Sequence, residues 1–236
     1  MQILLISIVI FLAVLTQSIS GFGVVLVAMA LLTQLTDIRI ATPLVALVAG
    51  SLEVILLIHY RKALNLKAVW RISVASLVGI PLGIMTFKNV AEETVLTVLG
   101  IVILSYALYT LLNLKLPRLA HQGWAYGFGL VAGMLGGAYN TSGPPVIIYG
   151  NCRGWLPAEF KGNLQGFFVF NSAFVLIGHA VAQNLSPLIW RTYLLTLPAI
   201  ALGLIVGLRL SRDINPVRFR KVVLGLLIVL GLRLIF

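Results

Sequence analysis

The chain has 236 residues, of which 60% are hydrophobic and only 10% are charged, and its formal net charge is +11. A soluble domain usually carries about a quarter charged residues, so this composition excludes an ordinary water-soluble fold. The basic excess does not indicate a nucleic-acid partner, because lysine and arginine accumulate in the cytoplasmic loops of membrane proteins. We therefore expect a protein that is embedded in a lipid bilayer.

Ten apolar segments follow one another along the chain, and their residues do not alternate between apolar and polar as the strands of a membrane β-barrel do. We predict an all-α membrane protein with helices at 2–19, 23–35, 38–60, 68–87, 95–113, 123–138, 144–152, 162–182, 187–209 and 217–236. The first segment leads into a polar break and not into a small-residue cleavage site, so we expect it to be retained and not removed as a signal peptide.

Two polar, glycine-containing breaks interrupt this pattern, at 16–23 and at 136–145. The segment that follows each break, 23–35 or 144–152, is too short to cross a bilayer comfortably as a helix. The other six segments are long enough to span. We therefore predict two broken helical hairpins, and the sequence leaves open whether their segments cross fully or re-enter on the same side.

An internal repeat appears when the chain is compared with itself at an offset of 120 residues. Gly23 then aligns with Gly143, and Trp70-Arg71 aligns with Trp190-Arg191. This alignment divides the chain into an N-terminal repeat, 1–120, and a C-terminal repeat, 121–236, within one membrane domain. Each repeat is predicted to contain a broken hairpin followed by three transmembrane helices.

The distribution of loop charges predicts the relative orientation of the repeats. If each broken pair enters and leaves on the same side, twelve loop lysines and arginines share one face, and only Arg39, Lys88 and Arg233 lie on the other. If each pair crosses once, the division is nearly even. The first arrangement fits the positive-inside tendency, and it predicts inverted repeats with both termini outside the cytoplasm.

The two breaks are the candidate binding site, because transporters with inverted repeats bind their substrates where helices are discontinuous. The N-terminus of a helix has N–H groups without intrahelical partners and a partial positive charge, which together suit an anion. Ser20 or Gly21 is expected to precede the first short helix, and Thr141 and Ser142 the second. The predicted substrate-binding residues are Gln17, Ser20, Gly21, Gly23, Asn140, Thr141, Ser142, Gly143 and Pro144. The alternative is that both breaks are only packing turns.

Other polar residues lie within predicted spans. Glu53 is a candidate for carrying a coupling proton, because an intramembrane carboxylate is expensive and usually functional; the alternative is a structural pairing with a cation of loop 61–67. Asn163 and Asn171 are candidates for lining a pathway, although interhelical hydrogen bonding explains them equally well. Arg71 and Arg191 each begin a span and are expected to snorkel to the interface.

Two motifs resemble those of a known family. Gly133, Gly136 and Gly137, followed by Gly143-Pro144-Pro145 and Tyr149, resemble the second-half signature of the TauE/SafE sulfite exporter family. Ser18, Gly21, Phe22 and Gly23 resemble the matching first-half motif. The resemblance covers the whole chain and implies transport of sulfite, sulfoacetate or related organic anions. Many relatives have a proline after the first Gly-Phe-Gly, whereas this chain has Val27 and Ala28 there.

We therefore predict a multi-pass protein of the cell membrane that is a secondary transporter of a small anion, either sulfite, a sulfonate or another organic anion, and that works by alternating access. An anion channel built on the same broken helices is the alternative. With a single cysteine, Cys152, and no nucleophile–base set, we expect no enzymatic activity, no cofactor and no metal site. The expected partners are the anion, the lipid bilayer and a coupling ion, either a proton or sodium; a homodimer is compatible with the sequence.

Overall fold

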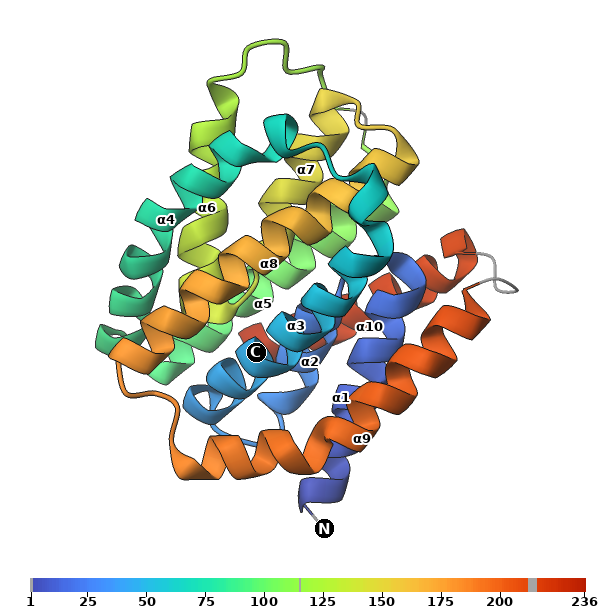
Figure 1. The fold of residues 1–236 in the computed structure, drawn as a ribbon. Helices are drawn as coiled ribbons and strands as arrows, with labels where there is room; N and C mark the ends of the chain where they lie inside the picture. The colour runs from blue at the N-terminus through green and yellow to red at the C-terminus, as the bar shows by residue number, and fades with distance from the viewer. Residues whose placement is uncertain (1, 115, 212–215) are drawn as a thin grey trace. The chain divides into compact units, whose positions relative to one another are not determined.

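The structure is a computed structural model that describes residues 2–114, 116–211 and 216–236. Within these residues it contains ten α-helices, one 3-10 helix and no strand (Figure 1), which confirms the all-α fold. The elements in chain order are α1 (Gln2–Ser20), α2 (Val24–Leu32), α3 (Ile38–Tyr60), η1 (Arg61–Ala63), α4 (Leu66–Asn89), α5 (Glu92–Leu111), α6 (Trp124–Tyr139), α7 (Gly143–Arg153), α8 (Pro157–Val181), α9 (Pro187–Leu210) and α10 (Pro216–Ile235).

Each predicted segment corresponds to one helix, and the largest difference is at the start of α8. This helix begins at Pro157, five residues before the predicted start, with Leu156 in an extended conformation before it. Proline suits the first turn because its missing N–H would have no intrahelical partner there, and Glu159 adds a favourable negative charge to the same turn. The sequence analysis placed the start later because these residues are not part of an apolar run.

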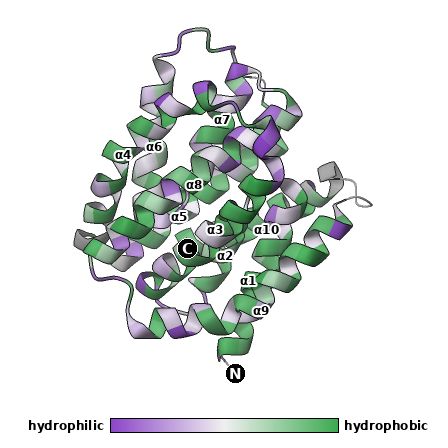
Figure 2. Cartoon of the chain, in the orientation of Figure 1, coloured by the Kyte–Doolittle hydropathy of each residue, from purple (hydrophilic) through white to green (hydrophobic). Residues whose placement is uncertain are grey.

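The lengths and surfaces of the helices identify a multi-pass membrane protein. Among the described residues, six helices are long and apolar enough to cross a bilayer, namely α1, α3, α4, α5, α8 and α9. Hydrophobic residues cover most of the length of these helices in Figure 2. Large apolar side chains are also exposed, including Val78 (63%), Leu195 (53%) and Val229 (63%). Hydrocarbon is the solvent that such a surface requires.

The helices form two compact units, and each unit combines helices from both predicted repeats. Unit 1 contains α1, α2, α3 as far as Val48, α5, α9 and α10; unit 2 contains α3 from Ala49 onward, η1, α4, α6, α7 and α8. The division into 1–120 and 121–236 therefore remains a prediction about internal duplication, because the compact units do not follow that boundary.

In unit 1, α1 packs along α9 and α5 packs along α10, while α2 contacts α1, α5 and α10. Glycines allow the first of these pairs to approach closely. A Cβ atom added at Gly207 of α9 would lie 3.1 Å from the carbonyl oxygen of Leu15 and 2.5 Å from Cβ of Ser18. The short helix α2 is thus held beside the long helices of its own unit.

In unit 2, α6 packs against α4 so closely that their backbones touch. Gly129, Gly133 and Gly137 recur every four residues on α6, and a Cβ at Gly133 would collide with the carbonyl oxygen of Ser76. A Cβ at Gly79 of α4 would collide in the same way with the backbone of α6. Small residues at this spacing are a common basis of helix pairing in membranes. α8 then covers α4, α6, α7 and η1.

The packing in the two units has one pattern. In each, the first helix of one predicted repeat, α1 or α6, packs on the fourth helix of the other, α9 or α4. Helices at corresponding positions of the two predicted repeats also have equal lengths: α4 and α9 have 24 residues each, and α5 and α10 have 20 each. This correspondence supports the duplication, and the inversion of one repeat relative to the other remains a prediction.

Candidate functional site

The first break lies in unit 1 and turns the chain sharply between α1 and α2. Gly21 and Gly23 both have left-handed backbone conformations, with φ of 86° and 110°. L-residues that have a side chain rarely adopt these backbone angles, whereas glycine does so without a steric penalty. The two glycines therefore fold the chain back so that α2 begins immediately, at Val24.

Gln17, which lies in the last turn of α1, connects this break to the start of α2. Its side-chain oxygen Oε1 accepts a hydrogen bond of 3.0 Å from the backbone N–H of Val24. The amide nitrogen Nε2 of the same side chain is buried and has no hydrogen-bond partner in the described part of the chain. Gln17 is only 2% exposed, so the break contains a buried N–H donor that the protein itself does not use.

Ser20 differs from its predicted role, because it ends α1 and does not precede α2. Its hydroxyl oxygen lies 2.7 Å from the carbonyl oxygen of Thr16 and also within hydrogen-bonding distance of that of Phe22, so its single proton is donated to one or shared between the two. Bonding of this kind to the carbonyl four residues earlier is common for serine in helices. The residue before α2 is Gly23, which has no side chain to cap the helix. Ser20 therefore stabilises the turn.

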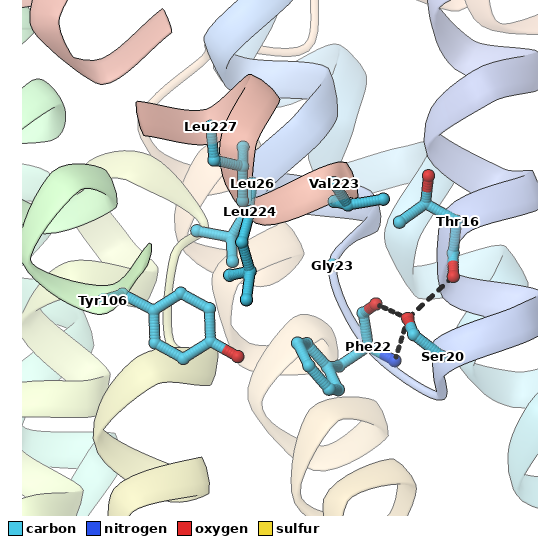
Figure 3. A pocket seen from close by; sticks show the side chains of 9 residues that line it. All are labelled: Thr16, Ser20, Phe22, Gly23, Leu26, Tyr106, Val223, Leu224 and Leu227. Carbon is cyan, nitrogen blue, oxygen red and sulfur yellow. Dashed lines mark hydrogen bonds between the residues drawn. The ribbon is translucent and has the colours of Figure 1, made fainter. Parts of the chain in front are cut away.

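A small cavity adjoins the first break, as Figure 3 shows. Its volume is about 10 Å³, and it is lined by Thr16, Ser20, Phe22, Gly23, Leu26, Tyr106, Val223, Leu224 and Leu227. This is close to the space that one water molecule needs. The ring of Phe22 meets that of Tyr106 edge-to-face, with 6.1 Å between the ring centroids. Tyr106 was not among the predicted residues, because nothing in the pattern of α5 distinguishes it.

The second break lies in unit 2, between α6 and α7. Asn140 has a left-handed conformation, with φ of 55°, which asparagine tolerates better than most residues. As predicted, Ser142 immediately precedes the short helix, which begins at Gly143 with prolines in its first turn. Proline is favourable there for the same reason as at α8.

The hydroxyl groups of the second break have different roles. Thr141 donates to the carbonyl oxygen of Tyr139 at 2.9 Å, so its hydroxyl is occupied by the turn. Ser142 makes no capping bond to α7, and the described part of the chain offers its hydroxyl no other recorded partner. At Gly143 an added Cβ would lie 3.6 Å from the ring of Phe168, in ordinary van der Waals contact, so this position tolerates a methyl group but is already closed off by the ring.

Asn171 of α8 brings a carboxamide to the second break. A Cβ added at Gly136 would lie 2.8 Å from Oδ1 of Asn171 and 3.3 Å from Cβ of Ser142, so these side chains adjoin the same glycine. Asn171 is 2% exposed, and its nitrogen Nδ2 has no hydrogen-bond partner among the described residues. Both breaks therefore contain a buried carboxamide N–H donor that the protein leaves unused.

The remaining predicted polar residues of unit 2 have other surroundings. Asn163 is fully buried, and its Oδ1 accepts a hydrogen bond of 2.8 Å from the backbone N–H of Asn65. It lies eight residues before Asn171 on α8, or about 12 Å along the helix axis. Glu53 is 4% exposed and accepts a hydrogen bond from the hydroxyl of Ser172. Ser172 was missed by the sequence analysis, although it adjoins Asn171.

The donors of the two breaks suit a small oxyanion. Carboxamide and backbone N–H groups are neutral, and the first turn of a helix adds a partial positive charge. A larger cavity of unit 2, with a volume of about 500 Å³, does not suit one, because apolar residues such as Leu77, Met85 and Phe174 line it. The described residues include no cluster of three or more histidine, cysteine, aspartate or glutamate side chains that could hold a metal ion.

Comparison with known proteins extends these observations to the whole chain. The family described as "Sulfite exporter TauE/SafE" matches residues 6–234, a range that includes both breaks. The chain belongs to the TauE/SafE family. Membership confirms the resemblance to this family, and it identifies a membrane transporter.

The TauE/SafE chain is also similar to a curated protein of Cupriavidus necator, named "Probable sulfite/organosulfonate exporter TauE". The two are 25% identical over 226 residues, which cover 91% of this chain and 86% of the relative. No solved structure gives a significant match to the chain.

Proposed function

We propose that this TauE/SafE protein is a secondary transporter that moves a small sulfur-containing anion, either sulfite or an organosulfonate, across the cell membrane by alternating access. The family and the name of the Cupriavidus necator relative support the substrate class. The helix breaks support an anion, because they bring unused N–H donors into the apolar interior of each unit.

The observation that carries the proposal is the pair of buried carboxamides, Gln17 at the first break and Asn171 at the second. A buried donor without a partner costs about 1–3 kcal/mol, and a hydrogen bond to a charged ligand contributes about 1.5–3 kcal/mol. Each unused donor therefore gains its bond when an oxyanion arrives. A sulfite or sulfonate group has three oxygen atoms that accept such bonds.

The neighbouring groups fit the same ligand. Ser142 makes no side-chain capping bond to α7, and Gly143 has no side chain of its own over the first turn of that helix. Gln17 already accepts the N–H of Val24, so its carboxamide is held at the N-terminus of α2. Asn140, Thr141 and Pro144 shape the second turn in this proposal and do not bind the anion through their side chains.

The test is transport by the purified protein in liposomes. Vesicles preloaded with unlabelled methanesulfonate should accumulate labelled methanesulfonate by counterflow, and the rate should saturate with concentration. Gln17→Leu and Asn171→Leu should each reduce this counterflow, whereas an exposed Glu93→Gln variant, whose residue lies at the start of α5, should not. Unitary currents in a planar bilayer without counterflow would support a channel and contradict the transporter.

A further inference from the structure

Glu53 and Asn171 are connected through one residue of α8. The hydroxyl of Ser172 donates to Oε2 of Glu53, and Ser172 follows Asn171 directly in the chain. The carboxamide of Asn171 in turn adjoins Gly136 and Ser142 at the second break. The carboxylate of Glu53 thus bonds to the residue that follows Asn171, a predicted anion ligand, and all three residues belong to unit 2.

No cation neutralises Glu53 in the described part of unit 2. The titratable side chains on the neighbouring stretches of α3 and α8 have other partners. His59 contacts the ring of Tyr60, Lys161 lies over the same ring, Glu159 accepts from Asn65, and His179 bonds to Asn184. Hence the only recorded partner of the Glu53 carboxylate is the Ser172 hydroxyl. Among the described residues, no ion pair joins Glu53 to a cation of loop 61–67, which was the alternative.

We propose that Glu53 is a proton-binding site whose occupancy is coupled to the anion at the second break, so that protonation favours anion binding and anion binding favours proton uptake. The inference rests on the proposed function, because it assigns the coupling ion of that same site. A carboxylate oxygen of Glu53 forms an O–H bond with a proton from a hydronium ion, one O–H bond of that ion breaks to leave water, and no other covalent bond changes. The Ser172 hydroxyl, which donates to the carboxylate, can accept from the carboxylic acid.

The physical reason is repulsion between like charges. With Glu53 ionised, an anion at Asn171 would be a second buried negative charge in the same unit. Glu53 bonds to Ser172, whose Cα lies about 3.8 Å from that of Asn171, so we take about 10 Å as the order of magnitude of the distance between the two charges. At an effective dielectric constant of about 20, this repulsion weakens binding roughly 10- to 20-fold. Protonation removes it.

The experiment is calorimetric titration of methanesulfonate into the full-length protein in detergent. The sulfonate group stays fully ionised between about pH 5 and pH 8, so any pH dependence belongs to the protein. Titrations in two buffers that differ in ionisation enthalpy measure the number of protons taken up. We expect affinity to rise roughly 10- to 20-fold from high to low pH in the parent. Linkage then limits proton uptake to a maximum of about half a proton per anion, at a pH between the pKa values of the free and the anion-bound protein.

Three variants complete the design. Glu53→Gln should bind with the low-pH affinity at every pH and without proton uptake, because glutamine is a neutral group of the same shape. Ser172→Ala should displace the pH profile without removing it, because the proton acceptor remains. Glu93→Gln is the matched control, since its carboxylate is exposed on α5, and it should behave like the parent.

The outcomes separate this inference from the proposed function. If methanesulfonate does not bind to the parent at any pH, the proposed function fails and the coupling fails with it. If the parent binds with equal affinity at all pH values and without proton uptake, the transporter proposal survives and the proton site is wrong. Proton uptake that persists in Glu53→Gln would also overturn the inference, because another group would then be the acceptor.

Discussion

Replacing Asn171 with leucine should make the protein more stable and the anion site weaker. Leucine branches at Cγ as asparagine does, but it is larger and has no polar atoms. In the protein without ligand, Asn171→Leu removes a buried N–H donor without a partner, whose burial costs about 1–3 kcal/mol. In a protein of this size, each kcal/mol corresponds to roughly 2–4 °C in Tm, so the melting temperature should rise by several degrees.

The affinity of Asn171→Leu should change in the opposite direction. Loss of one hydrogen bond to a charged ligand costs about 1.5–3 kcal/mol, which is roughly 10- to 150-fold in Kd. Thermal unfolding in detergent measures the first effect, and calorimetric titration with methanesulfonate measures the second. Such an opposition between stability and function is typical of residues kept for binding.

Asn163→Leu is the matched control on the same helix. Asn163 accepts the backbone N–H of Asn65, and its own Nδ2 has no partner among the described residues. Leucine there removes one unsatisfied donor and creates another, so it should raise Tm less than Asn171→Leu does and leave anion binding unchanged. If Asn171→Leu instead lowers Tm and leaves Kd unchanged, Asn171 is an ordinary packing residue and the reasoning about unused donors is wrong.

Three further predictions concern packing, topology and the shape of the second break. Gly133→Ala should lower stability by about 1–3 kcal/mol, since its Cβ collides with the backbone of α4, and thermal unfolding checks this. Single cysteines at Leu64 and Asn184 should be labelled from opposite sides of the membrane; labelling from one side would contradict the inverted arrangement. Gly143→Leu should abolish anion binding in calorimetry. Arg191→Gln is the control, because Arg191 is expected to reach the membrane interface, and this variant should still bind the anion. The reverse result would make the guanidinium of Arg191 the ligand.

The helices could be predicted because each is an apolar run that ends at polar or glycine residues, and hydropathy records this directly. The start of α8 was missed because its first turn, from Pro157 to Lys161, lies outside the apolar run. The expectation that Ser20 or Gly21 directly precedes the first short helix was also wrong, because Gly23 does. Which hydroxyl caps a helix depends on where the left-handed glycines turn the chain, and Gly21 and Gly23 turn it after Ser20 and not before it.

The candidate site was only partly accessible from sequence. Gln17 and Asn171 stood out as polar residues in or near apolar segments, but their unused nitrogens depend on contacts in three dimensions. The bond between Ser172 and Glu53 joins positions 119 residues apart, and no periodicity encodes such a pair. The division of the helices between the two units could not be predicted either. α1 and α9 are far apart in the sequence, and no local pattern in either helix indicates that they pack together.

The packing of α1 on α9 has a consequence for how the chain is made. α9 begins at Pro187, so the ribosome must synthesise most of the protein before the long partner of α1 exists. At about 5–20 residues per second, roughly 10–30 s pass between the two helices. During that time the polar end of α1, with Gln17 and its glycine turn, lies in the bilayer without the neighbour that later covers it. The hairpin of α1 and α2 therefore cannot complete its packing within unit 1 until α9 and α10 have been synthesised and inserted.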